Sequence, residues 1–325
     1  MDKRERLAHT LAGEPVDRPA VAVWRHWIGD DQRGPDLAQA VMQFQQQFDW
    51  DVIPIVPANT FSLADYGSFD VWDGDLYGRR KVTQHPIQRS LDWTNLRPLD
   101  PERGDFGRML ESIQLVTAAN TEKTPMILTV FSPFSQALEL VGRDMLLHHL
   151  RTSPDRIHLA LNVFAESLTR FLDVVRKTDI EGIHYVIDGA NYDLLSPQEY
   201  QVFGQGYDRQ ILSMLPSKFW LNIVHLRGTR GMFQMANDLQ ASLIQWQDRD
   251  SETNLVAGKS MALGAVCGGI TAELLQYGPA TSIRDQSLDT QQKTNGRRIL
   301  LSAGSFIHVT TPLAHLRALR QSVER

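Results

Sequence analysis

Eight short apolar runs recur along the chain, separated by helical or loop stretches, and this repetition limits the fold more than any other feature. The runs are AVAVW (20–24), DVIPIV (51–56), MILTVF (126–131), GIHYVI (182–187), FWLNIV (219–224), SLIQW (242–246), LGAV (263–266) and RILLS (298–302). They are apolar almost throughout rather than alternating with polar residues, which is typical of parallel strands buried on both faces.

Amphipathic segments between several of these runs indicate helices. The segment 155–178 repeats apolar residues at helical spacing, and 196–215 begins with a Ser-Pro cap followed by a first-turn Glu. Eight strands with intervening helices predict a (β/α)₈ barrel of the TIM type. The runs at 242–246 and 263–266 are the weakest strand candidates, so a doubly wound sheet remains an alternative.

One stretch, 66–96, interrupts the alternation. It is rich in Gly, Asp and aromatic residues, which predicts a hairpin insertion after the second strand. Insertions that follow the carboxyl ends of barrel strands commonly shape the mouth of the active site. The chain shows no internal repeat, and we expect one domain over 1–325 with the insertion at about 66–105.

The composition excludes several classes of protein. A formal net charge of -5 provides no overall attraction to nucleic acid or anionic lipid, so neither is an expected partner. No apolar run reaches membrane-spanning length and the first residues lack an apolar signal core, so a cytoplasmic location is expected. The one cysteine, Cys267, excludes an internal disulfide and any zinc site that needs two thiolates from this chain.

Several basic residues follow predicted strands, where barrel enzymes place their chemistry. Arg25 and His26 follow the first strand, and His225, Arg227 and Arg230 follow the fifth. Because arginine pairs with carboxylate or phosphate in a bidentate manner, these five residues predict an anion-binding rim. There are structural alternatives to this anion-binding role. Arg25 could pair with a carboxylate at the barrel mouth, and His225 could be a hydrogen-bonded histidine of the core.

Polar residues at other strand ends complete the candidate site. Asn59 follows the second strand, Asp188 and Tyr192 follow the fourth, and Ser305 follows the eighth. Asp188 is a candidate catalytic carboxylate, although it could instead cap a turn, and Tyr192 could simply pack. No glycine pattern matches a nucleotide-binding fingerprint.

Four segments carry a resemblance to the uroporphyrinogen decarboxylase superfamily over nearly the whole chain. They are ERLAHTLAGEPVDRPAVAVWRH (5–26), FSPFSQALELVG (131–142), VIDGANYDLLSPQEYQVFGQGYDRQIL (186–212) and GRRILLSAGSFIHVTTPLAHLRALRQSV (296–323). The resemblance implies a (β/α)₈ barrel, often dimeric, so a homodimer is one expectation. It also implies cofactor-free decarboxylation of a tetrapyrrole, or methyl transfer involving corrinoids or thiols.

The residues that the resemblance assigns are only partly kept. Arg25 matches an arginine that lies at the substrate carboxylates in the decarboxylase. Ala58, with Asn59 beside it, stands where the family has an aspartate that holds pyrrole NH groups, and Glu139 lies near the position of a tyrosine. Ser305 replaces a histidine after the last strand. These differences argue against the usual decarboxylation of uroporphyrinogen.

The zinc-dependent methyltransferases of the superfamily carry a His-x-Cys motif after the fifth strand and a second cysteine after the eighth. Here His225 keeps the histidine, but Arg227 and Ser305 stand at the two cysteine positions. Because the Arg227 cation would repel a metal dication, no zinc is expected. The decarboxylation that the resemblance implies uses no cofactor, so none is expected either.

The leading hypothesis is therefore cofactor-free decarboxylation of a polycarboxylated, tetrapyrrole-related ligand. Arg25, Arg227 and Arg230 would bind carboxylates, and His225 or His26 would supply the proton that replaces CO₂. Two alternatives remain open. One is zinc-independent methyl transfer linked to a corrinoid or thiol, and the other is a barrel that binds a tetrapyrrole or organic acid without catalysis.

Overall fold

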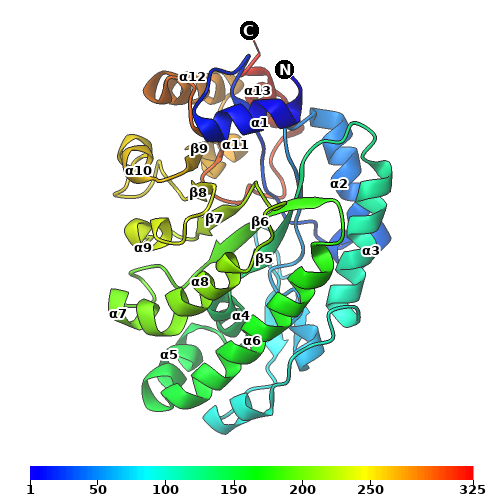
Figure 1. The fold of residues 1–325 in the computed structure, drawn as a ribbon, viewed down its shortest axis with the longest axis vertical. Helices are drawn as coiled ribbons and strands as arrows, with labels where there is room; N and C mark the ends of the chain where they lie inside the picture. The colour runs from blue at the N-terminus through cyan, green and yellow to red at the C-terminus, as the bar shows by residue number, and fades with distance from the viewer. Residues whose placement is uncertain (325) are drawn as a thin grey trace.

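The computed structural model describes residues 1–324, and its centre is a parallel eight-stranded sheet surrounded by helices (Figure 1). The strands are β1 (Ala20–Val21), β2 (Ile53–Ile55), β5 (Met126–Phe131), β6 (Ile180–Ile187), β7 (Ile223–Leu226), β8 (Leu243–Gln245), β9 (Ala265–Ile270) and β10 (Ile299–Ala303). They are ordered β1-β10-β9-β8-β7-β6-β5-β2, and every neighbouring pair is parallel.

The first and last strands of this order, β1 and β2, meet at Asp51, which closes the barrel. The backbone N–H of Asp51 donates to the carbonyl of Val21 at 3.0 Å, so the start of β2 lies against β1. The predicted (β/α)₈ barrel is confirmed, including the two weak strand predictions, which are β8 and β9. A doubly wound sheet is excluded, because the strand order runs around the barrel without reversing.

The helices follow the strands around the outside of the barrel. Their bounds are α1 (Lys3–Ala12), α2 (Gly34–Phe48), α3 (Gly104–Ala119), α4 (Pro133–Val141), α5 (Arg143–Thr152), α6 (Pro154–Val175), α7 (Pro197–Tyr200), α8 (Gly206–Ser213), α9 (Phe233–Asn237), α10 (Leu255–Met261), α11 (Ala272–Tyr277), α12 (Ala280–Thr294) and α13 (Leu313–Gln321). No helix within residues 1–324 is both long and apolar enough to cross a bilayer.

The helix predicted over 155–178 is α6, whose buried residues recur along one face. The helix predicted over 196–215 begins as expected, with Ser196 and Glu199 forming a capping box at α7. It is then interrupted by a π-helical turn at Gln201–Gln205 before continuing as α8. The interruption was not predicted, because side-chain periodicity does not report a change in backbone hydrogen bonding over one turn.

The predicted hairpin insertion is also confirmed. Strands β3 (Phe69–Val71) and β4 (Lys81–Gln84) form an antiparallel pair outside the barrel. The segment between them, residues 72–80, is called the strap below, because it passes over the carboxyl end of the barrel.

Candidate active site at the barrel mouth

Four charged side chains meet at the carboxyl ends of β5, β6 and β7, and they are called the mouth network. Arg227, which directly follows β7, places Nη1 3.3 Å from Oδ1 of Asp188 and 3.6 Å from Oε1 of Glu139 on α4. Arg79 of the strap donates from Nη2 to the same Glu139 oxygen. Two arginines and two carboxylates leave this network with no net charge, in contrast to the predicted positive rim.

The strap closes over the mouth because it is fixed on both sides of the barrel. On one side the hydroxyl of Tyr77 donates to Oε1 of Glu273, which lies on α11, at 2.7 Å. On the other side Arg79 is bonded to Glu139 of α4. Between them Gly78 lies against the side chain of His26, and there is no room for a Cβ atom.

Beneath the strap, three imidazoles surround the ring of Phe306. Its centroid is 4.6 Å from that of His26, 5.5 Å from that of His225 and 5.6 Å from that of His184. All three histidines are buried, with exposed fractions of 2% or less. The interior of the mouth is therefore dry, aromatic and lined with imidazole.

The three histidines differ in their hydrogen bonds. The ring of His184 is held at both nitrogens, by Thr129 at 3.2 Å and by Gln245 at 2.7 Å. His26 Nδ1 lies 3.0 Å from the carbonyl oxygen of Pro57. Neither ring nitrogen of His225 has a partner in residues 1–324. His184 is therefore fixed in the core, whereas His225 is held by no hydrogen bond and His26 is bonded through Nδ1 alone within residues 1–324.

Burial keeps these imidazoles neutral. Desolvation, with the nearby charges of Arg227 and Arg79, lowers the pKa of His26 to about 3. Burial also lowers the pKa of His225 well below its usual value, and the charges of His184 and Arg227 add to this. At neutral pH both rings are uncharged, and each can give up a proton as an acid only if its surroundings change and raise its pKa.

Arg25 does not lie with the other predicted residues, and this corrects the expected convergence. Its guanidinium stacks over the rings of Trp27 and Phe44, at 4.7 and 5.6 Å, and donates to the carbonyl of Val309 at 3.1 Å. The reason is strand alternation: Trp24 points into the barrel toward His184, so the next residue points outward to α2.

Two further predicted residues line a different cavity. Tyr192 and Arg230 border a hollow of about 420 Å³ beside α9, together with Trp246. Arg230 pairs with Asp193 at 2.9 Å, and both of these side chains are at least half exposed. Since Arg230 pairs with Asp193 at this cavity and Arg25 packs on Trp27, the mouth network contains only Arg227 of the three predicted carboxylate-binding arginines.

Asn59 and Ser305 lie close to the mouth, but both make local contacts. The Asn59 amide is used twice by the backbone of Arg80: it accepts from its N–H at 2.7 Å and donates to its carbonyl at 2.9 Å. Ser305 donates to the carbonyl of Phe306 at 3.0 Å. Asn59 therefore anchors one end of the strap, and Ser305 helps to place the Phe306 ring.

Four residues of the mouth were not predicted as site residues: Arg79, Glu139, His184 and Phe306. His184 lies inside β6 and not at its end. Glu139 follows a strand by eight residues, on a helix, and Arg79 belongs to an insertion whose position over the barrel is set by tertiary contacts. Phe306 lies beside Ser305 after β10, and its apolar side chain carries no chemical signal. The only indication of Glu139 in the sequence was its place near a tyrosine position of the family, in the segment 131–142.

The donor set does not fit the zinc ion of the related methyltransferases. Among residues 1–324 no group of three or more His, Cys, Asp or Glu side chains is placed to hold a metal. Arg227 and Ser305 occupy the expected cysteine positions, while Cys267 is fully buried and burial raises the pKa of its thiol. Since zinc sites need several such donors at about 2.0–2.3 Å, no step through zinc is derived.

Taken together, the barrel and its mouth define a (β/α)₈ protein with charged side chains and imidazoles at the carboxyl ends of its strands. The family described as Uroporphyrinogen decarboxylase (URO-D) matches residues 31–325. The chain belongs to this family. The relatives reported below bear the names of enzymes, either decarboxylases or methyltransferases.

Two similar proteins illustrate this division. The methylcobamide:CoM methyltransferase MtbA of Methanosarcina acetivorans is 22% identical over 244 residues, covering 69% of this chain and 70% of its own. The uroporphyrinogen decarboxylase of Prochlorococcus marinus strain NATL2A is 24% identical over 338 residues, covering 94% and 92%.

Solved structures support the same fold. A methyltransferase from Methanosarcina mazei superposes with a TM-score of 0.87 at 17% identity, covering 100% of this chain and 98% of its own. A B12-independent methionine synthase from Shewanella sp. W3-18-1 gives a TM-score of 0.59 at 12% identity, covering 94% of each chain. At these identities the likeness concerns the fold alone.

Proposed function

We propose that the barrel mouth binds a polycarboxylated small molecule and removes one of its carboxyl groups as CO₂ without a cofactor. The observation that supports this most directly is that Arg79 and Arg227 approach one carboxylate, that of Glu139, above two buried neutral imidazoles. Paired guanidinium groups are well suited to carboxylate recognition. The relatives named uroporphyrinogen decarboxylase make tetrapyrrole carboxylates the first compounds to test.

The approach of such a substrate would begin at Arg79, whose side chain is 38% exposed, whereas that of Arg227 is only 15% exposed. A substrate carboxylate would pair with Arg79 from the solvent side and lift the strap from Glu139. The Asp188 carboxylate would stay on Arg227 and hold it in place.

Binding of the anion would also prepare the proton donor. Burial lowers the pKa of His26, and the charges of Arg227 and Arg79 lower it further. The negative charge that a substrate carboxylate adds to the balanced network would raise this pKa. When the bond to the departing carboxylate breaks, its electron pair stays on carbon and CO₂ leaves. The His26 or His225 ring, which would first take up a proton from solvent, then gives that proton to the carbon, and such acid catalysis contributes about 10²–10⁴-fold.

An anaerobic thermal-shift screen with uroporphyrinogen, coproporphyrinogen and small tricarboxylates tests the proposal, followed by measurement of CO₂ release. A ligand at about a hundredfold its Kd should raise the free energy of unfolding by about 2.7 kcal/mol. We expect Arg79→Gln to weaken this ligand about tenfold or more, because it removes a charged hydrogen bond to the carboxylate.

Arg230→Gln is the matched control, since Arg230 lies in the cavity beside α9 and should leave binding unchanged. Equal losses in both variants would contradict the mouth as the carboxylate site. Binding that depends on Arg79 but is followed by no CO₂ release would indicate a barrel that binds without this catalysis.

Methyl transfer is the second candidate, and it is supported by His225, whose free ring nitrogens lie at the end of β7. The MtbA relative makes methylcobalamin the compound to test. Stabilisation by methylcobalamin that His225→Ala removes, without any response to the porphyrinogens, would favour this candidate over decarboxylation.

A further inference from the structure

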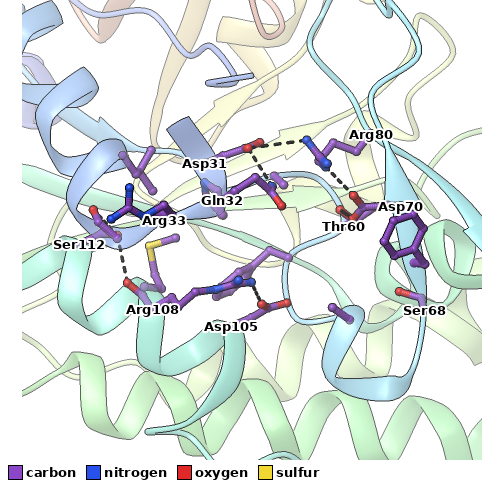
Figure 2. Close-up of a pocket in the computed structure, with 18 residues that line it drawn as sticks. Asp31, Gln32, Arg33, Thr60, Ser68, Asp70, Arg80, Asp105, Arg108 and Ser112 are labelled. Atoms are coloured by element: carbon purple, nitrogen blue, oxygen red, sulfur yellow. Dashed lines mark hydrogen bonds and ion pairs between the residues drawn. The ribbon is translucent and has the colours of Figure 1, made fainter. Parts of the chain in front are cut away.

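A second cavity lies outside the mouth network and shares none of its four residues. It has a volume of about 400 Å³ and is formed by the loop after β1, the loop after β2, the β3–β4 hairpin and the first turns of α2 and α3 (Figure 2). It is called the outer cavity here. Its size is in the range of sites for small organic ligands.

Six charged residues line the outer cavity, and most of them satisfy one another. Asp70 accepts from Nε of Arg80 at 2.5 Å and from the hydroxyl of Thr60. Asp105 is paired with Arg108 across one turn of α3. With Arg33 and Asp31 the lining holds three cations and three anions, so it has no net charge that would select a strongly charged ligand.

Asp31 is the carboxylate that this arrangement leaves incomplete. Its Oδ1 accepts from Nε2 of Gln32 at 2.9 Å, and the nearest guanidinium, that of Arg80, is 3.9 Å away and already bonded to Asp70. Its Oδ2 has no partner in residues 1–324, although the side chain has an exposed fraction of 0%. Figure 2 shows this carboxylate bordering the cavity, across from Asp105.

A second polar atom on the same cavity is also unsatisfied. The hydroxyl oxygen of Ser68 is buried without a hydrogen-bond partner in the described part of the chain. A buried carboxylate oxygen without a donor is costly, and a charged donor compensates it better than a neutral one. None of the three lining arginines bonds Asp31 Oδ2, so this oxygen is the place for a cationic donor from a ligand.

The remainder of the lining is apolar. Leu37 of α2, Phe61 of the loop after β2 and Met109 of α3 contribute carbon surface to the cavity. We propose that the outer cavity binds a small organic amine, whose ammonium group pairs with Asp31 and whose hydrocarbon part lies against these three side chains.

Three six-carbon probes with different head groups test this assignment: n-hexylamine, 1-hexanol and hexanoate, each titrated calorimetrically into the 325-residue protein. We expect hexylamine to bind, hexanol to bind at least about tenfold more weakly, and hexanoate not to bind. Asp31→Asn should weaken hexylamine about tenfold or more, which corresponds to losing one charge-assisted hydrogen bond.

Two variants separate this effect from a change in folding. Asp36→Asn removes an exposed carboxylate at the start of α2, paired with Arg33 at 3.3 Å, and should leave hexylamine binding unchanged. Ala64→Phe adds bulk at an exposed position that lines the cavity, and should abolish binding while the melting temperature is kept. Equal binding of hexanol and hexylamine, preference for hexanoate, or undiminished hexylamine binding in Ala64→Phe would each overturn the proposal.

Discussion

Gly78 shows how one residue determines the shape of the mouth. It has a φ of +78°, and a Cβ atom there would lie 2.6 Å from Cγ1 of Val309 and 3.0 Å from the Cβ of His26. Only glycine combines this backbone conformation with such a close approach. The strap can therefore lie directly on the Cβ atom of His26, the residue whose imidazole the proposed chemistry uses.

Gly78→Ala should lower the free energy of unfolding by about 2–4 kcal/mol, because backbone strain and overpacking add. Gly74→Ala is the control, since Gly74 has a φ of +98° but no atom within 4 Å of its Cβ position. Urea unfolding of both variants measures the difference. Equal effects would mean that contact of the strap with His26 contributes nothing beyond backbone strain.

The helical segment after β6 contains a buried acid whose ionisation the fold resists. Asp208 of α8 accepts from the hydroxyls of Tyr185 and Tyr200, each at 2.7 Å. Burial raises the pKa of Asp208 to about 7. Asp208 thus connects α8 to Tyr185 of β6 and Tyr200 of α7 through a carboxyl group that is easier to bury when protonated.

This raised pKa makes stability depend on pH. Between about pH 4 and pH 7 the folded chain keeps a proton on Asp208 that the unfolded chain releases, so the contribution of Asp208 is fully present below pH 4 and is lost as pH rises to 7. Three pKa units correspond to about 4 kcal/mol. In Asp208→Asn this part of the pH dependence should vanish.

The measurement is urea unfolding of wild type and Asp208→Asn between pH 4.5 and 8, compared as a difference at each pH. The stability of wild type relative to the variant should fall as the pH rises. A difference that stays constant over this range would contradict a raised pKa at Asp208.

For the molecule as a whole, closure of the barrel depends on the Asp51 carboxylate. It lies 2.7 Å from guanidinium nitrogens of both Arg6 and Arg18, and accepts from the N–H of Val21 at 2.8 Å. Its side chain is fully buried. One residue thereby joins α1, β1 and the start of β2, where the ends of the sheet order meet.

Asp51→Ala should lower the free energy of unfolding by about 3–5 kcal/mol, because Arg18 loses its carboxylate partner and the buried Arg6 keeps only Asp17. Asp36→Ala removes an exposed ion pair and should change it by less than about 1 kcal/mol. Denaturant unfolding of both proteins checks this. A loss at Asp51 no larger than that at Asp36 would show that barrel closure does not rest on the carboxylate.

The sequence by itself determined the architecture. The number and order of the eight strands, the hairpin insertion and the cap at Ser196 were predictable, because burial on both faces, turn residues and capping are local properties. The strand bounds were less exact: β7 and β9 each share only two residues with the predicted runs 219–224 and 263–266. The sequence also placed His225 and Arg227 at the end of a strand. For these features the chemical signal lies within a few neighbouring residues.

Only the tertiary structure decided which side chains meet. Strand alternation turned Arg25 to the outside of the barrel, and the strap brought Arg79 to Glu139, 60 positions further along the chain. The mouth network has no net charge because these distant contacts pair its two arginines with two carboxylates. Contacts between distant segments depend on the twist of the barrel and on the path of the insertion. The residues that make a contact do not by themselves determine either property.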